Sequence, residues 1–313
     1  MASPRRSPSF LFHSIGLVAA LCCACAPGRD AGGSGRGAPP VSVVDDWGRT
    51  VRLAGPAHRI VSLAPASTEL VFALGLGGRL VGRTTWCDYP PAARDVPDVG
   101  NGIAPSVEAV AARRPDLVLL YASEADRAAL GSLTRIGIPV AVLRLDRARD
   151  LARDARLVAT LAGEPAAGDS LADAFAAALA AATRPAPARP VRVYVDVQSD
   201  PPITVGRGSY LTEIIAAAGG RNIFDDIGGG SGPVSLEAVA QRDPDVVVVL
   251  ASDTTAAPAL ERGAGWGAVA AVRAGRVLVL DGSLYGHPSP RMPAAVRALA
   301  ANLARVSAGR GGP

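Results

Sequence analysis

The segment PSVEAVAARRPDLVLL at residues 105–120 has a counterpart, VSLEAVAQRDPDVVVV, at residues 234–249. Each copy contains a serine, a glutamate two positions later, a short apolar stretch, a Pro-Asp pair and a hydrophobic run. Glu108 and Glu237 occupy equivalent positions, 129 residues apart (237 minus 108). A separation this large, occurring once, indicates a duplicated lobe, because solenoid repeats recur every ~20–50 residues.

The duplicated unit also predicts its own local structure. Its serine can cap a helix, its glutamate falls in the first helical turn, and its Pro-Asp pair is typical of a turn that leads into a buried strand. Two like lobes in one chain predict a cleft between them, in which a ligand would be held.

Composition describes a globular chain and gives no sign of nucleic-acid binding. The 313 residues suffice for two domains with a core each, and 49% hydrophobic with 19% charged residues excludes disorder. The net charge is +4, and all basic residues are arginines interleaved with acidic residues. Since no basic run coincides with a binding motif, we expect no nucleic-acid partner.

The first residues predict an export signal. An arginine pair precedes the apolar stretch 10–21, which is too short to span a bilayer, and Cys25 follows a small residue. This pattern predicts a lipoprotein signal peptide at residues 1–25, with Cys25 acylated after cleavage. Cys22 and Cys23 remain competing acceptors.

The rest of the chain offers no disulfide, zinc spacing or second membrane segment. Residues 26–40 are rich in Gly, Ala and Pro and predict a flexible tether. Cys87 is the one cysteine outside the signal, so the mature chain cannot form an internal disulfide, and we interpret it as a small, partly buried residue. We expect no metal site and no resident cofactor.

Strand and helix patterns alternate on both sides of one alanine-rich stretch, which predicts an α/β fold with parallel sheets. We expect an N-terminal α/β lobe at residues 41–164, an inter-lobe helix at residues 165–184 and a C-terminal α/β lobe at residues 190–308. The alanine content of the middle stretch favours a long, straight helix.

A second, shorter pair of similar segments supports the duplication. Thr68-Glu69-Leu70 precedes a glycine in the first lobe, as Thr212-Glu213-Ile214 does in the second. Ser67 or Thr68 can cap the helix that contains Glu69. Glu69 and Glu213 lie further inside their helices than the first glutamate pair, so we expect them to have roles within their own helices.

Several ordered motifs together resemble the cobalamin and iron-complex substrate-binding proteins of ABC importers. Besides the duplicated unit, they are RIVSLAPASTELVFALG at 59–75, CDYPP at 87–91, GGRNIF at 219–224 and SPRM at 289–292. The resemblance implies a class III periplasmic binding protein: two Rossmann-like lobes joined by a single long rigid helix, with the ligand between the lobes.

In this family a glutamate at the start of a helix in each lobe docks onto arginines of the permease. The matching positions are Glu108 and Glu237. A carboxylate in a first helical turn is stabilised by the helix dipole, and two of them, one per lobe, would set the orientation of docking. The alternative is that each glutamate serves only its own helix.

The resemblance also implies a ligand wall. Trp86 and Tyr121 match positions where aromatic rings contact the corrin, and Tyr285 falls in the loop that reaches the ligand from the second lobe. His287 could coordinate haem iron or be an ordinary polar residue. Val197 stands where the relatives lead us to expect an aromatic. The matches at Trp86 and Tyr121 favour a cobalamin or related corrinoid, and haem or an iron siderophore are the alternatives.

No catalytic motif is present: the chain lacks G-x-S-x-G, H-E-x-x-H and a P-loop, and Cys87 lacks a histidine partner. We therefore expect a monomeric binding lipoprotein rather than an enzyme. It would lie in the periplasm or on the outer face of the cytoplasmic membrane and deliver a metal chelate to an ABC permease and ATPase complex. The alternative of another class is a non-transporting ligand sensor.

Overall fold

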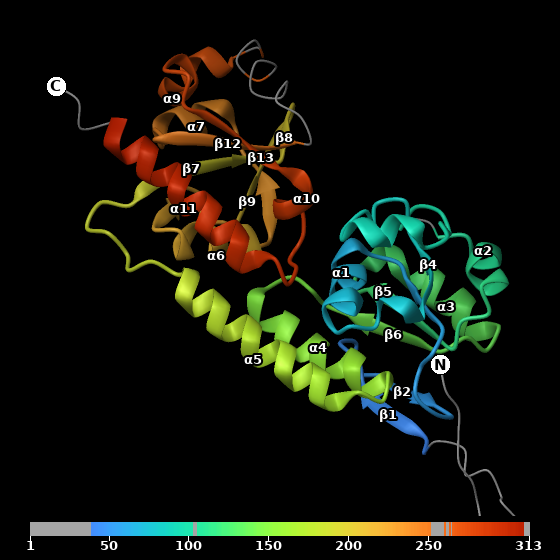
Figure 1. Cartoon of the computed structure of the whole chain (residues 1–313). Coiled ribbons are helices and arrows are strands. Elements are labelled where there is room, and N and C mark those ends of the chain that lie inside the picture. The colour runs from blue at the N-terminus through green and yellow to red at the C-terminus, as the bar shows by residue number, and fades with distance from the viewer. Residues whose placement is uncertain (1–38, 103–104, 252–259, 261–262, 264, 310–313) are drawn as a thin grey trace, which may run out of the picture. The chain divides into compact units, whose positions relative to one another are not determined.

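Two parallel four-stranded sheets organise the chain, and a long helix lies between them in the sequence (Figure 1). The computed structural model describes residues 39–102, 105–251, 260, 263 and 265–309. The predicted signal peptide, its Cys25 and nearly all of the predicted tether lie outside the described residues. Among the described residues, no helix combines the length and apolar character that crossing a bilayer requires.

The first sheet has the strand order β4-β3-β5-β6. Its strands are β3 (Ile60–Ser62), β4 (Leu80–Arg83), β5 (Leu117–Tyr121) and β6 (Val140–Leu143). The connecting elements are α1 (Pro65–Ala73), η1 (Gly77–Arg79), η2 (Pro91–Asp95), α2 (Val107–Ala112), η3 (Glu124–Asp126) and α3 (Arg127–Arg135). A separate antiparallel hairpin, β1 (Val41–Val44) and β2 (Thr50–Leu53), precedes them.

The second sheet has the order β10-β7-β12-β13. Its strands are β7 (Val191–Asp196), β10 (Gly220–Asn222), β12 (Val246–Ala251) and β13 (Val277–Asp281). Its helical elements are α6 (Tyr210–Ala217), α7 (Leu236–Gln241), η4 (Trp266–Ala268), α9 (Ala270–Arg273), α10 (Gly282–Tyr285) and α11 (Met292–Gly309). A small antiparallel sheet, which the sequence did not predict, is formed by β8 (Gln198–Ser199), β9 (Pro202–Val205) and β11 (Ser231–Pro233).

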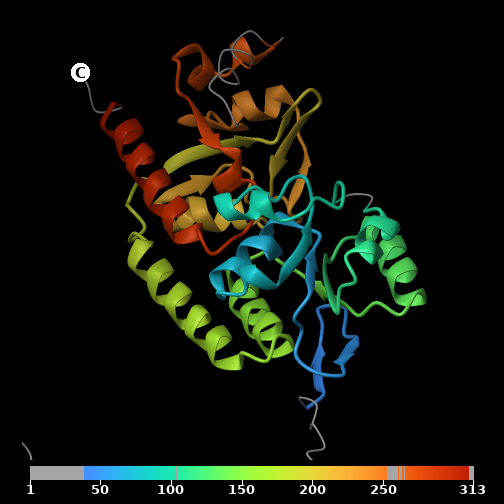
Figure 2. The ribbon, with the colours of Figure 1, turned by 45° about the vertical axis from the view of Figure 1, so that its right-hand side comes forward.

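The chain passes from the first sheet to the second through α4 (Ala148–Leu161) and α5 (Pro165–Ala182). Helix α5 has 18 residues, begins with a proline in its first turn and packs against α4 and α11 (Figures 1 and 2). The exposed, proline-rich segment 183–190 then leads into β7. The predicted fold class, two α/β lobes joined by a long helix, is confirmed.

The duplicated unit keeps its backbone geometry in both lobes. Ser106 and Ser235 cap α2 and α7, each accepting a hydrogen bond 3.1 Å long from the backbone N–H three residues later. The residue before each Pro-Asp pair is left-handed, with φ of 47° at Arg114 and 41° at Asp243. The capping serines predicted from the sequence are confirmed.

The predicted cap at the start of α1 is wrong. The helix begins at Pro65, two residues before Ser67, and the fixed φ of proline suits a first helical turn. The Ser67 and Thr68 hydroxyls instead donate back to the Ala64 carbonyl, at 3.0 and 3.1 Å, and Thr68 also donates to Ser62 in β3 at 2.8 Å. These polar side chains therefore tie the start of α1 to the end of β3.

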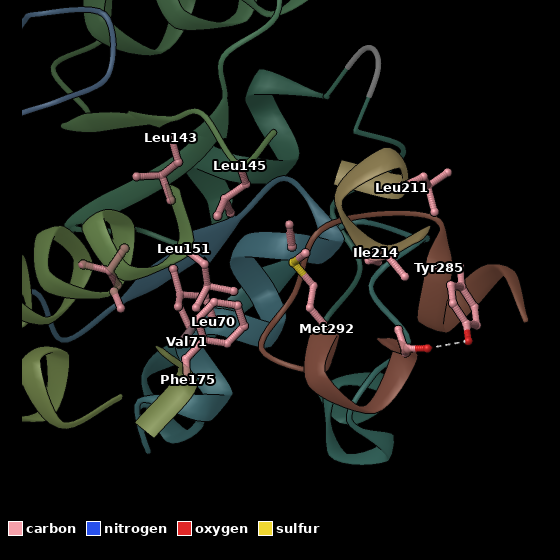
Figure 3. Packing of buried hydrophobic residues seen from close by; sticks show 14 of the residues in the cluster. Leu70, Val71, Leu143, Leu145, Leu151, Phe175, Leu211, Ile214, Tyr285 and Met292 are labelled. Atoms are coloured by element: carbon pink, nitrogen blue, oxygen red, sulfur yellow. Dashed lines mark hydrogen bonds between the residues drawn. The ribbon is translucent and has the colours of Figure 1, made fainter. Parts of the chain in front are cut away.

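One hydrophobic cluster contains side chains from both lobes and from the helices between them. Figure 3 shows Leu70 of α1 with Leu151 of α4 and Phe175 of α5, and places Met292 of α11 in the same cluster. Burial of such side chains contributes roughly 1.5–3 kcal/mol each relative to exposure. The lobes thus share part of their core.

Candidate ligand-binding cleft

A cleft of about 550 Å³ lies between residues of the two lobes. It is lined at the carboxyl ends of parallel strands and the first turns of helices, where open α/β sheets commonly bind ligands. The lining residues of the first lobe are Ala64, Pro65, Ala66, Tyr121, Leu145 and Asp146; those of the second are Gly208, Ser209, Tyr210, Gly230, Gly286, His287 and Pro288.

Tyr121 is the last residue of β5, and its hydroxyl donates a hydrogen bond to Asp146. Burial and this hydrogen bond both raise the pKa of Tyr121, so the phenol stays protonated. Its place at the carboxyl end of the strand explains its exposure: the four preceding residues of β5 are buried on both faces of the sheet, and Tyr121 emerges at the sheet edge with 37% of its surface exposed. The structure thus places Tyr121 in the cleft wall.

Tyr285 lies in the core rather than in the cleft wall. Its ring is 3% exposed, and its hydroxyl donates to the Ala295 carbonyl at 2.8 Å, as Figure 3 shows. The aromatic residue that the second lobe does bring to the cleft is Tyr210, at the start of α6. Its hydroxyl donates to the backbone carbonyl of Tyr285 at 2.6 Å. Burial raises the pKa of Tyr210 as well.

Sequence reasoning missed Tyr210 and Asp146. Tyr210 follows Gly206-Arg207-Gly208 and the capping Ser209 in a chain with 4% aromatic residues, so an aromatic at a glycine-flanked helix start was the available clue. Asp146 carries no motif, and only the loop geometry after β6 brings it to Tyr121.

Trp86 is exposed in the turn after β4 and is not among the lining residues of the cleft. Its ring has 63% of its surface exposed, and it follows β4 at the same sheet edge from which Ala64 and Tyr121 reach the cleft. Val197, where an aromatic was expected, is also exposed, directly after β7. Among the lining residues that the structure describes, the two with phenyl rings are therefore tyrosines, one from each lobe.

The first turns of α1 and α6 open into the cleft from opposite lobes. The amino end of a helix carries partial positive charge. Since no arginine is among the described residues that line the cleft, these helix starts and His287 are its features that favour negative groups on a ligand.

Glu69 of the first lobe contacts two residues of the second lobe. The expectation that it acts within its own helix is therefore wrong. Glu69 is buried in α1 of the first lobe, where it meets His287 and Arg291 of the second. The His287 Nε2 lies 2.8 Å from Glu69 Oε1, and Arg291 Nε donates to Oε2 at 2.8 Å. Burial alone would raise the pKa of Glu69, but the hydrogen bonds from His287 and Arg291 outweigh it and lower the pKa below its ordinary value.

Glu213, the equivalent residue of the second lobe, in turn contacts the first lobe. It forms an ion pair with Arg147 and accepts a hydrogen bond 2.9 Å long from the backbone N–H of Ala148, at the start of α4. The interpretation of Glu213 as a residue acting within its own helix is therefore also wrong. The duplicated glutamates form two reciprocal contacts between the lobes, both close to the cleft.

Glu108 and Glu237 lie in the first turns of α2 and α7, and both are exposed. The Ser106 hydroxyl donates to Glu108 at 3.2 Å, and backbone and Ser235 hydrogen bonds lower the pKa of Glu237. Within the part of the chain that the structure describes, neither carboxylate has an ion-pair partner. Both are available to an external cation.

Cys87 is buried, with its Sγ 3.1 Å from the Thr84 hydroxyl. Burial raises the pKa of the thiol, which makes it a weak nucleophile at neutral pH. In the described ranges, no group of three or more His, Cys, Asp or Glu side chains is arranged to hold a metal ion.

The profile of the periplasmic binding protein family matches residues 60–284, which is more than half of the chain. The chain belongs to this family. A curated vitamin B12-binding protein of Vibrio cholerae is 28% identical over 241 residues, covering 75% of this chain and 85% of that protein.

Two solved structures resemble the chain over most of its length. The periplasmic haem-binding protein from Roseiflexus is 29% identical with a TM-score of 0.73, covering 80% of this chain and 99% of that one. The periplasmic vitamin B12-binding protein of Vibrio cholerae is 26% identical with a TM-score of 0.69, covering 80% and 98%. Because the family and these relatives are binding proteins, the prediction that the chain is not an enzyme is confirmed.

The cross-lobe pair of Glu69 generates a stability prediction. Glu69→Gln is expected to lower the free energy of unfolding by about 2–4 kcal/mol at pH 7, because it leaves the Arg291 guanidinium without its buried counterion. A carboxylate whose pKa is lowered by folding contributes stability above its unfolded pKa and loses it as the pH falls through its folded pKa. The deficit should therefore disappear in acid, as measured by denaturant unfolding across pH.

The matched control is Glu124→Gln, which removes an exposed ion pair with Arg127 inside the first lobe. It should leave stability nearly unchanged. A Glu69→Gln deficit of the same size at acid and neutral pH would mean that shape, not charge, explains the loss.

Proposed function

We propose that this protein captures a metal tetrapyrrole, a corrinoid in the first place, and delivers it to the permease of an ABC importer. The cleft between the lobes carries this proposal. Its volume of about 550 Å³ suits a small-molecule ligand, and Tyr121 and Tyr210 offer an aromatic side chain from each lobe. The Vibrio cholerae relatives named for vitamin B12 binding support the corrinoid.

Haem is the second candidate. The observation that favours it is His287, an imidazole in the cleft wall, since imidazole is a common ligand of haem iron. The helix starts of α1 and α6 would suit the carboxylates of a haem edge. The Roseiflexus relative, named as haem-binding, supports this alternative.

Delivery to a permease is supported by the duplicated glutamates. Glu108 and Glu237 are exposed, lie one in each lobe, and have no ion pair of their own among the described residues. Two carboxylates on separate lobes provide a two-point contact that would orient the protein on arginines of a permease. A ligand sensor that does not transport would have no use for this contact.

The ligand is tested by titrating the purified protein with cyanocobalamin, haemin and a ferric siderophore, using calorimetry and absorption spectra. Tyr121→Ala is expected to weaken binding of the preferred chelate by about 1–3 kcal/mol, because the ring forms part of the cleft wall. Trp86→Ala should have a smaller effect, since the exposed ring can meet only the outer edge of the ligand. Unchanged affinity in Tyr121→Ala would contradict the proposed wall.

Docking is tested with Glu108→Ala and Glu237→Ala. Each is expected to weaken association with the permease by about 2–5 kcal/mol, the usual loss when one member of an interfacial charge pair is removed. Chelate affinity should stay unchanged, because neither residue lines the cleft. Glu124→Ala, another exposed glutamate in a first helical turn, is the control. Wild-type uptake by the double variant would refute docking through these residues.

Membrane attachment through acylated Cys25 is part of the same proposal. In cells, Cys25→Ser should move the protein from the membrane fraction to the soluble fraction, because the remaining chain would lack its lipid anchor. Mass spectrometry of the mature N-terminus would establish which cysteine is modified. Acylation at Cys22 or Cys23 in the wild type would reassign the anchor to that residue.

A further inference from the structure

His287 presents one ring nitrogen to Glu69 and leaves the other free. Its Nε2 lies 2.8 Å from Glu69 Oε1, and its ring lines the cleft. Within the described residues, the His287 Nδ1 has no hydrogen-bond partner. A neutral imidazole that donates through Nε2 carries its lone pair on Nδ1. Glu69 therefore fixes the tautomer that has an electron-pair donor available.

We infer that Glu69 positions His287 as an axial nitrogen ligand for the metal of a chelate held in the cleft. The inference rests on the proposed function, since it needs a metal chelate as cargo. Imidazoles that bind metals almost always donate their second N–H to a carboxylate or a carbonyl, which orients the ring and raises its basicity. The Glu69–His287 pair has this arrangement.

Arg291 holds the Glu69 carboxylate in position by hydrogen bonds, and the carboxylate holds the His287 imidazole. Its Nε donates to Glu69 Oε2 at 2.8 Å, and its terminal nitrogen donates to Oε1 and to the Ser283 carbonyl. The guanidinium also lies over the Tyr89 ring, 3.7 Å from its centroid. Glu69 is thus held on both oxygens and kept ionised, so it can act only as an acceptor toward His287.

This arrangement discriminates between classes of chelate. A nitrogen donor strengthens binding only where the metal has an axial position that is vacant or exchangeable, as in haem iron or the cobalt of an aquacorrinoid. A ferric siderophore whose oxygens fill all coordination positions gains nothing from His287. The Glu69–His287 pair therefore favours tetrapyrroles over saturated iron chelates.

The test compares haemin with metal-free protoporphyrin IX, using the full-length protein, with aquacobalamin in parallel. The wild type should bind haemin at least about tenfold more tightly than the porphyrin and show the absorption and electron-paramagnetic-resonance spectra of nitrogen-ligated ferric haem. His287→Ala should remove that preference and that spectrum, and added imidazole should restore the spectrum. Glu69→Gln should weaken haemin binding by about 10–100-fold, with an altered spectrum and little change for protoporphyrin.

Glu124→Gln is the control, because it removes an exposed ion pair with Arg127 and touches neither His287 nor the contacts between the lobes. It should leave the haemin spectrum unchanged. The inference is overturned if His287→Ala and wild type give the same spectrum, or if Glu69→Gln leaves the haemin spectrum unchanged. Should Glu69→Gln not fold, the His287→Ala protein with added imidazole decides. Failure of the wild type to bind haemin and aquacobalamin would overturn the proposed function as well.

Discussion

Two glutamates, one from each lobe, contact the opposite lobe and hold the cleft in place. Glu69 of α1 is bound by His287 and Arg291, and Glu213 of α6 is bound by Arg147 and the start of α4. Each is buried or half-buried, so its charge is only weakly screened by water. Because α1 and α6 also supply cleft residues, the spacing of the cleft walls depends on these two contacts.

The duplication divides its four glutamates between two tasks. The pair at Glu69 and Glu213 faces inward and joins the lobes, whereas the pair at Glu108 and Glu237 faces solvent. Glu108, Glu213 and Glu237 lie in first helical turns, where a carboxylate is favoured by the helix dipole, whereas Glu69 lies one turn further into α1. The two pairs differ in the helices that carry them. Glu69 and Glu213 lie in helices whose first residues line the cleft, whereas Glu108 and Glu237 follow the capping serines of α2 and α7.

The alternation of strands and helices in both lobes could be predicted from hydrophobic runs and turn residues, and the long helix between the lobes from its alanine content. The strands β8, β9 and β11 could not, because they are two to four residues long, and β9 and β11 contain prolines or a glycine that usually mark loops. The residues of the ligand-binding cleft were harder to predict from the sequence. Tyr121 ends a buried strand, and the sequence predicted it in the cleft. That Tyr210 and not Tyr285 lines the cleft from the second lobe depends on how α10 and α11 pack. The partners of Glu69 lie more than 200 residues away, and no local pattern reports them.

The peptide chain passes between the lobes once, through α5 and the exposed segment 183–190. A protease that cut this segment would separate the covalent chain into two halves, each with its own parallel sheet. The halves would still share the hydrophobic cluster and the two cross-lobe glutamate contacts. The molecule is in this sense a heterodimer whose subunits are linked by a helix, and its two halves could be produced apart and reassembled.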